Sequence, residues 1–246
     1  MPMNAKVVIQ AGGKGTRLYP YTKVLPKPLM PVGGMPILEI VIRQLAACGF
    51  RDLTISVGYL GEMIRLCCGD GSKWGVRIQY VSETKPLGTM GPLQLVKGLD
   101  RPFLVMNGDL LTDLDFADFY RWHMNGDAPL SIATYQKPVN ISLGVLKTDA
   151  EGYVNAFQEK PTLHFPCSMG IYVMDPQLLE LIPPGDAFGF DQLILKMIEQ
   201  GVPARSYPFR GIWMDIGRPE DFHDACEFFE KQPHVFLPSE SRKEAA

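Results

Sequence analysis

The stretch Ala11-Gly-Gly-Lys-Gly-Thr-Arg17 directly follows the apolar run Val7-Val8-Ile9. A strand that ends in a glycine-rich turn leaves several backbone N–H groups pointing outward, where they can hold phosphate oxygens. Arg17 and, ten residues further on, Lys27 add two cations near that turn. The N-terminal part of the chain therefore predicts a polyphosphate site at the end of a buried strand.

Two familiar phosphate-binding motifs do not fit this turn. The Walker A loop requires Ser or Thr after its lysine, whereas Gly15 follows Lys14 here. The dinucleotide fingerprint is met at Gly13 and Gly15, but Leu18 stands at the position of its third glycine. An ordinary glycine-rich turn between two elements remains the alternative to a phosphate site.

Length and composition bound the fold and the location of the protein. The 246 residues, 46% hydrophobic and 21% charged, suit one large α/β domain. We expect this domain to span residues 1–232 and the polar residues 233–246 to form a loose C-terminal tail. Apolar stretches are shorter than a membrane-spanning helix and no signal-peptide pattern precedes the first strand, so we expect a cytoplasmic protein with no membrane partner.

Charge and cysteine content exclude further classes of function. The net charge of −3 argues against a nucleic-acid surface, but a few local cations suffice for a small anionic substrate. The five cysteines show no C-x-x-C pair and no metal-ligand spacing, and we assign them no role. The oligomeric state is not readable, and a homo-oligomer stays open.

Apolar runs of strand type alternate with helical patterns in the first half of the chain. This alternation predicts a parallel sheet covered by helices on both faces. From residue 128 to 174 strands follow strands, so we expect a mixed sheet with an antiparallel excursion. The expected strands are Lys6–Gln10, Leu53–Val57, Arg77–Val81, Phe103–Met106, Leu130–Tyr135, Leu143–Lys147 and Gly170–Met174. The expected helices are Ile37–Cys48, Leu87–Leu99, Phe116–Met124, Phe190–Glu199 and Pro219–Lys231.

Charged residues follow four apolar runs. Gly12–Arg17 follows the first strand, and Asn107-Gly-Asp109 follows Phe103–Met106. Two further runs of strand type, Tyr153–Phe157 and Gly211–Met214, are followed by Glu159-Lys-Pro161 and Asp215-Ile-Gly217. Ligands of open α/β sheets bind at the carboxyl ends of the strands. We therefore expect the four groups to converge on one site.

Asp109 and Asp215 are candidate ligands for a magnesium ion. Mg²⁺ is held in proteins by one or two carboxylates together with substrate phosphates. The alternative for Asp109 is an Asp that accepts hydrogen bonds within its own turn, and the alternative for Asp215 is a cap for the helix expected from Pro219. Lys160 beside Glu159 would add a third cation to Arg17 and Lys27, and its alternative is a weak surface ion pair.

Glu83 opens a second glycine-containing loop, Glu83-Thr-Lys-Pro-Leu-Gly-Thr-Met-Gly91. A carboxylate there can accept two hydrogen bonds from the guanine edge, N1–H and the 2-amino group, whereas uracil and thymine offer no such paired donors. The alternative is a surface glutamate in a loop, which the residues alone favour.

Six motifs in this order resemble those of the sugar-1-phosphate nucleotidyltransferases. The resemblance runs from about residue 6 to 230 and is specific at the level of the reaction class. It implies an α/β, Rossmann-like nucleotidyltransferase fold with a mixed, mostly parallel sheet flanked by helices. It also implies transfer of a nucleotidyl group from an NTP to a sugar 1-phosphate, with release of pyrophosphate. The motifs are Ala11–Pro20, Pro26–Gly34, Pro86–Thr89, Asn107–Asp109, Glu159–Pro161 and Trp213–Gly217.

The resemblance also implies a role for each matching residue. Arg17, Lys27 and Asp109 would be catalytic, and Asp109 and Asp215 would hold Mg²⁺. The Gly12–Arg17 loop would hold the triphosphate, and Lys27 would neutralise the α-phosphate and the incoming sugar phosphate. The base would lie on Glu83 and Gly88, and the sugar phosphate on Gly144, Glu159 and Lys160. The residues implied to bind the substrates are Ala11, Gly12, Gly13, Gly15, Thr16, Arg17, Lys27, Glu83, Gly88, Thr89, Asn107, Gly108, Asp109, Gly144, Glu159, Lys160, Ser168 and Asp215.

The second loop is most similar to that of guanylyl-transferring members, such as those acting on mannose 1-phosphate or heptose 1-phosphate, so GTP is the expected nucleotide. Members that use dTTP or UTP tend to carry Gln at the position of Glu83, and use of UTP, dTTP or CTP stays open. The chain departs from the family at Ser168-Met-Gly170, often Asn-Ala-Gly, and at Leu143-Gly-Val-Leu146, often Tyr-Gly-Val-Val. Both segments belong to the implied sugar pocket, so the sugar is not transferable.

Two further readings compete with an active transferase. The first is a catalytically silent subunit that senses nucleotide sugars on the same fold, although Arg17, Lys27 and both carboxylates are present. The second is a dinucleotide-dependent oxidoreductase, which the broken glycine fingerprint disfavours.

Overall fold

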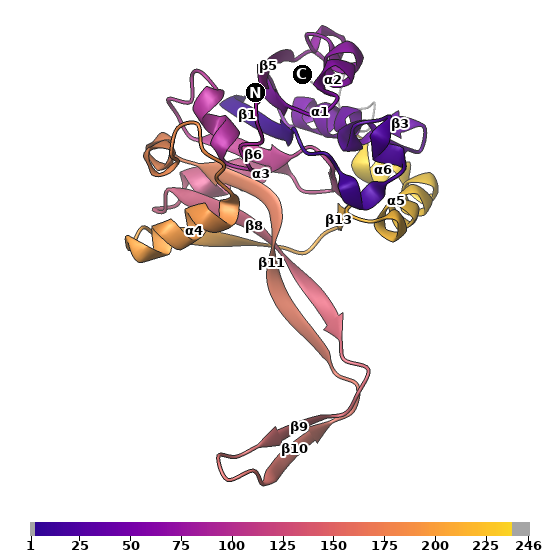
Figure 1. Ribbon diagram of the computed structural model, residues 1–246, viewed down its shortest axis with the longest axis vertical. Helices are drawn as coiled ribbons and strands as arrows, with labels where there is room; N and C mark the ends of the chain where they lie inside the picture. The colour runs from indigo at the N-terminus through magenta and orange to yellow at the C-terminus, as the bar shows by residue number, and fades with distance from the viewer. Residues whose placement is uncertain (1–2, 238–246) are drawn as a thin grey trace.

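A seven-stranded sheet forms the centre of the computed structural model, which describes residues 3–237 (Figure 1). Its strand order is β12-β8-β11-β6-β1-β4-β5, and β11 is antiparallel to both of its neighbours while the other pairs are parallel. The expected mixed, mostly parallel sheet is therefore confirmed. The strands are β1 Met3–Ala11, β4 Phe50–Val57, β5 Arg77–Ser82, β6 Phe103–Asn107, β8 Leu130–Asn140, β11 Thr162–Met174 and β12 Ala204–Phe209.

Helices cover both faces of this sheet. The α-helices are α1 Ile37–Ala47, α2 Gly61–Cys68, α3 Phe116–Met124, α4 Phe190–Glu199, α5 Pro219–Lys231 and α6 Pro233–Phe236. Val7 and Ile9 of β1 pack in one core with residues of α1, α2 and α3, whereas Val8 packs in a second core with α4. Alternate side chains of a strand point to opposite faces, so a continuous apolar run such as Val7-Val8-Ile9 belongs to a strand buried on both sides.

Three short ladders complete the fold. They are β2 Pro31–Val32 with β3 Met35–Pro36, β7 Leu110–Thr112 with β13 Trp213–Asp215, and β9 Val145–Thr148 with β10 Val154–Gln158. The 3₁₀ turns are Thr16–Leu18, Tyr21–Lys23, Lys27–Leu29, Ser72–Trp74, Gly91–Leu95 and Pro176–Leu181.

The expected helix Leu87–Leu99 is wrong, because this segment contains only the 3₁₀ turn Gly91–Leu95. Gly88 has a φ of +74°, and the backbone N–H groups of Met90 and Gly91 both donate to the Phe188 carbonyl, at 2.9 and 3.1 Å. These long-range hydrogen bonds hold the backbone out of a continuous helix. Helix α2 and strand β12 were not expected from the sequence.

A two-stranded arm, residues 136–168, projects from the body of the molecule (Figure 1). Its root is the ladder of β8 with β11, whose pairs run from Ser168↔Thr134 to Thr162↔Asn140. The β9–β10 hairpin forms its end. The expected antiparallel excursion is thus confirmed, but it leaves the body instead of lying on the sheet.

The segment expected as a loose tail from residue 233 begins with an ordered turn. Helix α6 places Phe236 in a core formed with α5, where its ring lies 5.6 Å from that of Phe228 and 6.0 Å from that of Phe229. The prediction of a loose tail is therefore wrong for residues 233–236. Burial of the apolar Phe236 side chain stabilises the docked helix, whereas a loose tail would leave this side chain in water. Residues 238–246 lie outside the described range.

We expect Phe236→Ala to lower the free energy of unfolding by about 3–5 kcal/mol, since the ring is 1% exposed and its removal leaves a cavity. Urea unfolding at equilibrium measures this change. Leu195→Ala, at an exposed position of α4, is the control and should stay within about 0.5 kcal/mol of the unchanged chain. Equal effects of the two substitutions would show that α6 does not dock.

Candidate active site

The glycine-rich loop and the Asn107–Asp109 turn lie side by side at the carboxyl edge of the sheet. Strands β1 and β6 are parallel neighbours with Gln10 opposite Asn107, so both chains turn at the same level. The Gly108 N–H donates to the Gln10 carbonyl at 2.9 Å, and a Cβ at Gly108 would lie 3.1 Å from that oxygen. A side chain at position 108 would force the two turns apart by a few tenths of an ångström.

Asp215 reaches the same point from the far end of the chain. Strand β13 pairs antiparallel with β7, which places Asp215 opposite Leu110 and therefore next to Asp109. The buried Lys27 ammonium forms an ion pair with Asp109 and lies 3.8 Å from a carboxylate oxygen of Asp215. Two carboxylates and one lysine, from three separate segments, thus share a centre.

The glycine-rich loop Gly12–Arg17 packs against that centre. Gly15 has a φ of +60°, and a Cβ there would lie 3.2 Å from the Cβ of Lys27. The Thr22 hydroxyl donates to the Gly15 carbonyl at 2.8 Å. Nothing lies within 4 Å of the position that a Cβ on Gly13 would take. The exposed Arg17 guanidinium lies close to Gly217, because a Cβ on Gly217 would be 3.2 Å from Arg17 Nη1. The loop therefore presents backbone to solvent directly above Lys27 and Asp215.

Partial withdrawal from water raises the pKa of Asp215 above its usual value, and the nearby Asp109 carboxylate adds to this, while Lys27 and Arg17 oppose it. A divalent cation between the two carboxylates would relieve this repulsion. The carboxylate oxygens of Asp109 and Asp215 are ligands that suit Mg²⁺, which completes its coordination with phosphates and water. Within residues 3–237 there is no group of three or more His, Cys, Asp or Glu side chains that could hold a metal ion.

The raised pKa predicts a pH-dependent gain in stability on Asp215→Asn. A carboxyl whose pKa is higher in the folded than in the unfolded chain contributes stability below about pH 4, and this contribution is lost as the pH rises through the folded pKa. The variant should therefore melt at a higher temperature than the unchanged chain at pH 8, with a difference that shrinks toward pH 4. Thermal unfolding across this range measures the difference, and Asp186→Asn, at an exposed position before α4, controls for loss of a charge. A lower melting temperature of Asp215→Asn at pH 8 would contradict the prediction.

Glu83 lies beside the glycine-rich loop Gly12–Arg17, and its carboxylate accepts hydrogen bonds from the protein itself. It accepts hydrogen bonds from the Leu87 N–H at 2.8 Å and from the Ser56 hydroxyl at 3.3 Å. A Cβ at Gly12 would collide with the same carboxylate. The Glu83 carboxylate therefore lies between Ser56 of β4, Leu87 of its own loop and Gly12, which follows β1, and contact with a base stays a prediction.

Gly88 and Thr89 tie this loop to the segment before α4. A Cβ at Gly88 would lie 2.7 Å from the Phe188 carbonyl oxygen, and the Thr89 hydroxyl accepts a hydrogen bond from the Phe190 N–H at 2.9 Å. Gly88 and Thr89 thus help to hold this loop against residues 188–190, and their implied contacts with the nucleotide stay predictions.

The expected convergence of four strand ends is wrong for Glu159 and Lys160. These residues form a mutual ion pair of 4.0 Å on the arm, with more than 60% of each side chain exposed. Gly144 is with them, because a Cβ there would lie 3.1 Å from Glu159 Oε2. The β8–β11 ladder carries this group away from the sheet, which the local pattern of residues could not indicate.

Ser168 lies at the root of the arm, close to the body site. Its hydroxyl donates to the Tyr172 hydroxyl at 3.1 Å and accepts from the Gly170 N–H at 3.2 Å. Gly170 in turn lies against Asn107, since a Cβ on it would be 2.6 Å from Asn107 Nδ2. Ala11 and Asn107 end strands β1 and β6, and Thr16 and Gly108 lie in the segments that follow these strands.

A hollow of about 430 Å³ adjoins Asp215 and was not expected from the sequence. It is lined by Arg17 and Asp215 together with Tyr135 and Lys137 of β8 and Arg218, which follows the Asp-Ile-Gly motif. Gln10 was also missed: its side-chain Nε2 is buried without a hydrogen-bond partner at the end of β1. A polar residue at the end of an otherwise apolar strand was the available signal.

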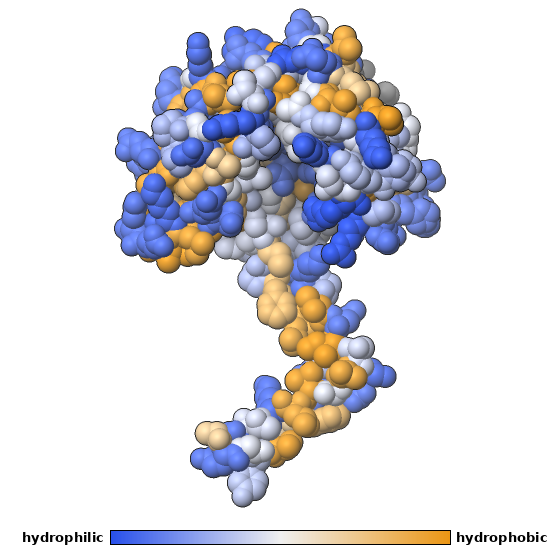
Figure 2. Space-filling model, in the orientation of Figure 1, coloured by the Kyte–Doolittle hydropathy of each residue, from blue (hydrophilic) through white to orange (hydrophobic). Residues whose placement is uncertain are grey.

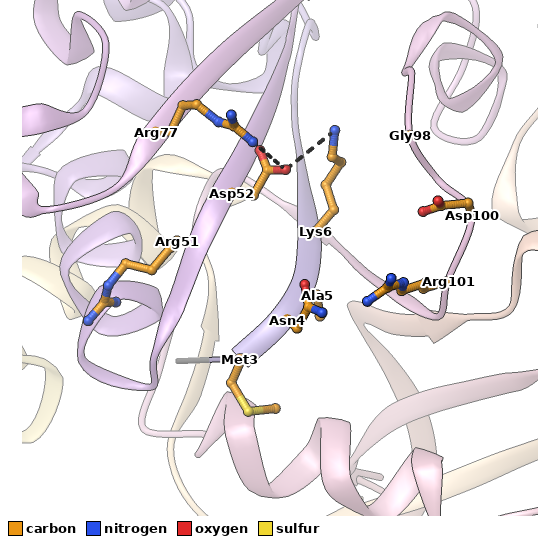
Figure 3. A pocket seen from close by; sticks show the side chains of 10 residues that line it. All are labelled: Met3, Asn4, Ala5, Lys6, Arg51, Asp52, Arg77, Gly98, Asp100 and Arg101. Atoms are coloured by element: carbon orange, nitrogen blue, oxygen red, sulfur yellow. Dashed lines mark hydrogen bonds and ion pairs between the residues drawn. The ribbon is translucent and has the colours of Figure 1, made fainter. Parts of the chain in front are cut away.

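A larger hollow, of about 550 Å³, lies at the opposite edge of the sheet, around the amino ends of β1 and β4 (Figure 3). Its cations are largely occupied: Lys6 and Arg77 pair with Asp52 at 3.6 and 3.1 Å, and Arg51 donates to the Phe50 carbonyl at 2.9 Å. Strand carboxyl ends carry the ligands of open α/β sheets, so the smaller hollow belongs to the site.

The profile of the Nucleotidyl transferase family matches residues 6–232. The chain belongs to this family. It is 32% identical to a UTP–glucose-1-phosphate uridylyltransferase of Synechocystis sp., over 89% of this chain and 62% of that protein. It is 32% identical to a mannose-1-phosphate guanyltransferase of Yarrowia lipolytica, over 95% of this chain and 68% of that protein. The chain thus spans less than two thirds of the first of these relatives.

The fold agrees with a solved structure of the family. A putative glucose-1-phosphate thymidylyltransferase from Bacillus anthracis superposes with a TM-score of 0.72, at 25% identity, covering 91% of this chain and 94% of that one. The Rossmann-like nucleotidyltransferase fold expected from the motifs is confirmed. Within the described residues, none of the helices is long and apolar enough to cross a membrane.

Proposed function

We propose that this protein transfers a nucleotidyl group from an NTP to a sugar 1-phosphate, releasing pyrophosphate and an NDP-sugar. The observation that carries the proposal is the placement of the buried Lys27 between Asp109 and Asp215 beneath the Gly12–Arg17 loop. The two relatives named above and the Bacillus anthracis protein are each named for one such transfer, which supports the reaction class.

The residues divide the work between binding and charge neutralisation. Backbone N–H groups of the Gly12–Arg17 loop hold the triphosphate, and Arg17 holds the pyrophosphate end. Lys27 neutralises the non-bridging oxygens of the α-phosphate. A sugar-phosphate oxygen attacks the α-phosphorus in line, the bond from that phosphorus to the bridging oxygen breaks, and pyrophosphate leaves with the electron pair. The nucleophile is already an anion, so positioning and electrostatics supply the rate.

Asp109 and Asp215 are the residues that would hold Mg²⁺. The ion would supply positive charge to the phosphate oxygens as they react. The carboxylates also position Lys27, because ion pairs with Asp109 and Asp215 restrict where its ammonium can lie.

GTP is the proposed nucleotide. The Yarrowia lipolytica relative is named for guanylyl transfer, and Glu83 lies beside the phosphate loop with a carboxylate that has lone pairs beyond the two hydrogen bonds it accepts. The other two proteins are named for uridylyl and thymidylyl transfer, so the base is the point to test. The cytoplasmic location stays a prediction.

The test is an assay of pyrophosphate release with Mg²⁺ and each of GTP, UTP, dTTP, CTP and ATP in turn. Each nucleotide is paired with the 1-phosphates of mannose, glucose, glucosamine and heptose. GTP should give the highest kcat/KM with at least one sugar. A higher value with UTP or dTTP would leave the transferase in place and remove the guanylyl assignment.

We expect Glu83→Gln to lower kcat/KM for GTP relative to UTP and dTTP, by roughly tenfold or more, because one of the paired acceptors becomes a donor. The amide oxygen can still accept from the Leu87 N–H, so the loop should stay in place. Gln79→Glu, a reversed exchange at an exposed position of β5, is the control. An unchanged nucleotide preference would remove the role of Glu83 in base choice.

A further inference from the structure

We propose that the arm of one copy of this chain docks on a second copy and completes the sugar-phosphate subsite of that copy with Glu159 and Lys160. This inference rests on the proposed function for its chemistry, but the docking itself can be tested without turnover. The argument starts from what the arm exposes.

The arm carries an unusual share of exposed apolar surface. Half of the large apolar side chains exposed in residues 3–237 lie on it (Figure 2): Val139, Leu143, Leu146, Tyr153, Val154, Phe157, Leu163 and Phe165. Phe157 is 63% and Tyr153 74% exposed. An isolated two-stranded ribbon is marginal in water, so a strip of this kind requires a covering surface.

The arm also carries Glu159 and Lys160, to which the family resemblance gives a sugar-phosphate role, too far out to reach the site on their own body. From Ser168, close to the body site, to Thr162 the β11 strand extends about 20 Å, and Lys160 lies beyond it. A lysine side chain cannot span that gap. Lys160 is, with Leu60, one of two non-glycine residues with a positive φ in the described range, and strained backbone of this kind gathers at binding sites.

Folding the arm back onto its own body would break the fold's longest ladder. The hydrogen-bonded pairs from Ser168↔Thr134 to Thr162↔Asn140 continue into the central sheet, so both strands would have to bend together. A second copy can receive the arm with this ladder intact.

One face of the arm leads directly to the body site. Every second residue of β8 points to the same face, and Tyr135, Lys137 and Val139 share one such face. Their partners on β11, in the same order, are Cys167, Phe165 and Leu163. Tyr135 and Lys137 line the hollow beside Asp215, and the Tyr135 ring lies 5.6 Å from that of Trp213. An arm from another molecule that packs on this face is thereby guided to the hollow.

The chemistry of the arm favours another copy of itself as the partner. Residues 136–168 contain three lysines and three carboxylates, so these groups give two arms no net repulsion and offer no basic patch for a nucleic acid or an anionic membrane. If each of two copies docks its arm on the other, the dimer has two-fold symmetry and no arm is left to bind a third copy. Eight side chains at roughly 100 Å² each bury about 800 Å² per copy, the size of a standard stable interface.

The first experiment measures the mass of the protein in solution by sedimentation equilibrium at micromolar concentration. The unchanged chain should show twice its 27.4 kDa mass, and Leu146→Ser/Tyr153→Ser/Phe157→Ser should show one chain. The control Leu66→Ser/Leu195→Ser/Ile198→Ser removes side chains of similar exposure from α2 and α4 and should stay at two chains. A monomeric unchanged chain, or an arm variant that stays dimeric, would overturn the proposal.

The second experiment asks which body the arm touches, and it does not require the triple variant to fold. A photo-crosslinking side chain replaces Tyr153, and ¹⁵N-labelled and unlabelled chains are co-expressed or exchanged before irradiation. Peptides that join the arm to residues 213–224 should pair labelled with unlabelled chain. Crosslinks confined to chains of one isotope would place the arm on its own body and overturn the proposal.

The third experiment is complementation between Lys27→Met and Lys160→Ala. Each variant alone should retain less than a tenth of the activity. In a mixed dimer the copy with intact Lys27 receives an intact arm, so an equal mixture should recover about a quarter of the unmutated rate. Background activity of the mixture would overturn completion across copies. An inactive unmutated enzyme would instead sink the proposed function, while mass and crosslinks still decide the docking.

Discussion

Lys27→Met should reduce kcat at least ~100-fold, the usual cost of removing one preorganised electrostatic stabiliser from a phosphoryl-transfer site. Lys27 is the buried cation of the site, and its ammonium is held by two carboxylates from distant parts of the chain. Methionine keeps the length and the apolar stem but leaves the charge on the α-phosphate oxygens uncompensated. The loss should appear in kcat more than in KM, because the charge it meets grows toward the transition state.

Lys23→Met provides the matched control, since it removes a lysine four positions earlier whose side chain is exposed. It should keep kcat within about twofold of the unchanged enzyme. Thermal unfolding of both variants separates loss of chemistry from loss of fold. A Lys27→Met protein that is folded and turns over at the unmutated rate would show that the site has been misassigned.

Asp109→Asn should also reduce kcat at least ~100-fold at saturating Mg²⁺. The amide keeps the shape of the side chain but loses the charge that pairs with Lys27 and would hold the metal. Raising the Mg²⁺ concentration should recover part of the rate, because a weakened site still binds by mass action. Steady-state rates across a Mg²⁺ titration measure both effects.

Asp100→Asn, in the hollow at the opposite edge of the sheet, is the control and should leave rate and metal dependence unchanged. If Asp109→Asn showed the same rate and the same Mg²⁺ dependence as the unmutated protein, Asp109 would be a turn residue, as its alternative reading holds. Asp215 would then need another partner for a metal.

The body of the site was predictable because its signals are local. The run Val7–Ile9 followed by a glycine turn, and Phe103–Met106 followed by Asn-Gly-Asp, each indicate a strand and the ligand-bearing turn after it. Parallel pairing then places both turns at one edge of the sheet. Asp215 was identified because it follows the apolar run Gly211–Met214, but the antiparallel pairing of β13 with β7 is what brings it next to Asp109.

The arm was not predictable because it depends on strand length beyond the sheet. Residues 130–174 read as several strands, and nothing in their alternation distinguishes a hairpin that lies on the body from one that leaves it. The prediction of a helix over Leu87–Leu99 was wrong for a related reason. The backbone of this segment is hydrogen-bonded to the Phe188 carbonyl, about a hundred positions away. Hydrogen bonds of such long range do not appear in a local pattern.

The central claim is a single centre, made of Lys27, Asp109 and Asp215 under the Gly12–Arg17 loop, that joins a nucleotide to a sugar phosphate. Its most direct test is pyrophosphate release by the purified protein with Mg²⁺ and GTP, measured with and without each sugar 1-phosphate and repeated with the other nucleotides. Release should require a sugar 1-phosphate, equal the NDP-sugar formed, and disappear in Lys27→Met. Silence of the folded, unmutated protein with every pair of nucleotide and sugar phosphate would contradict the account.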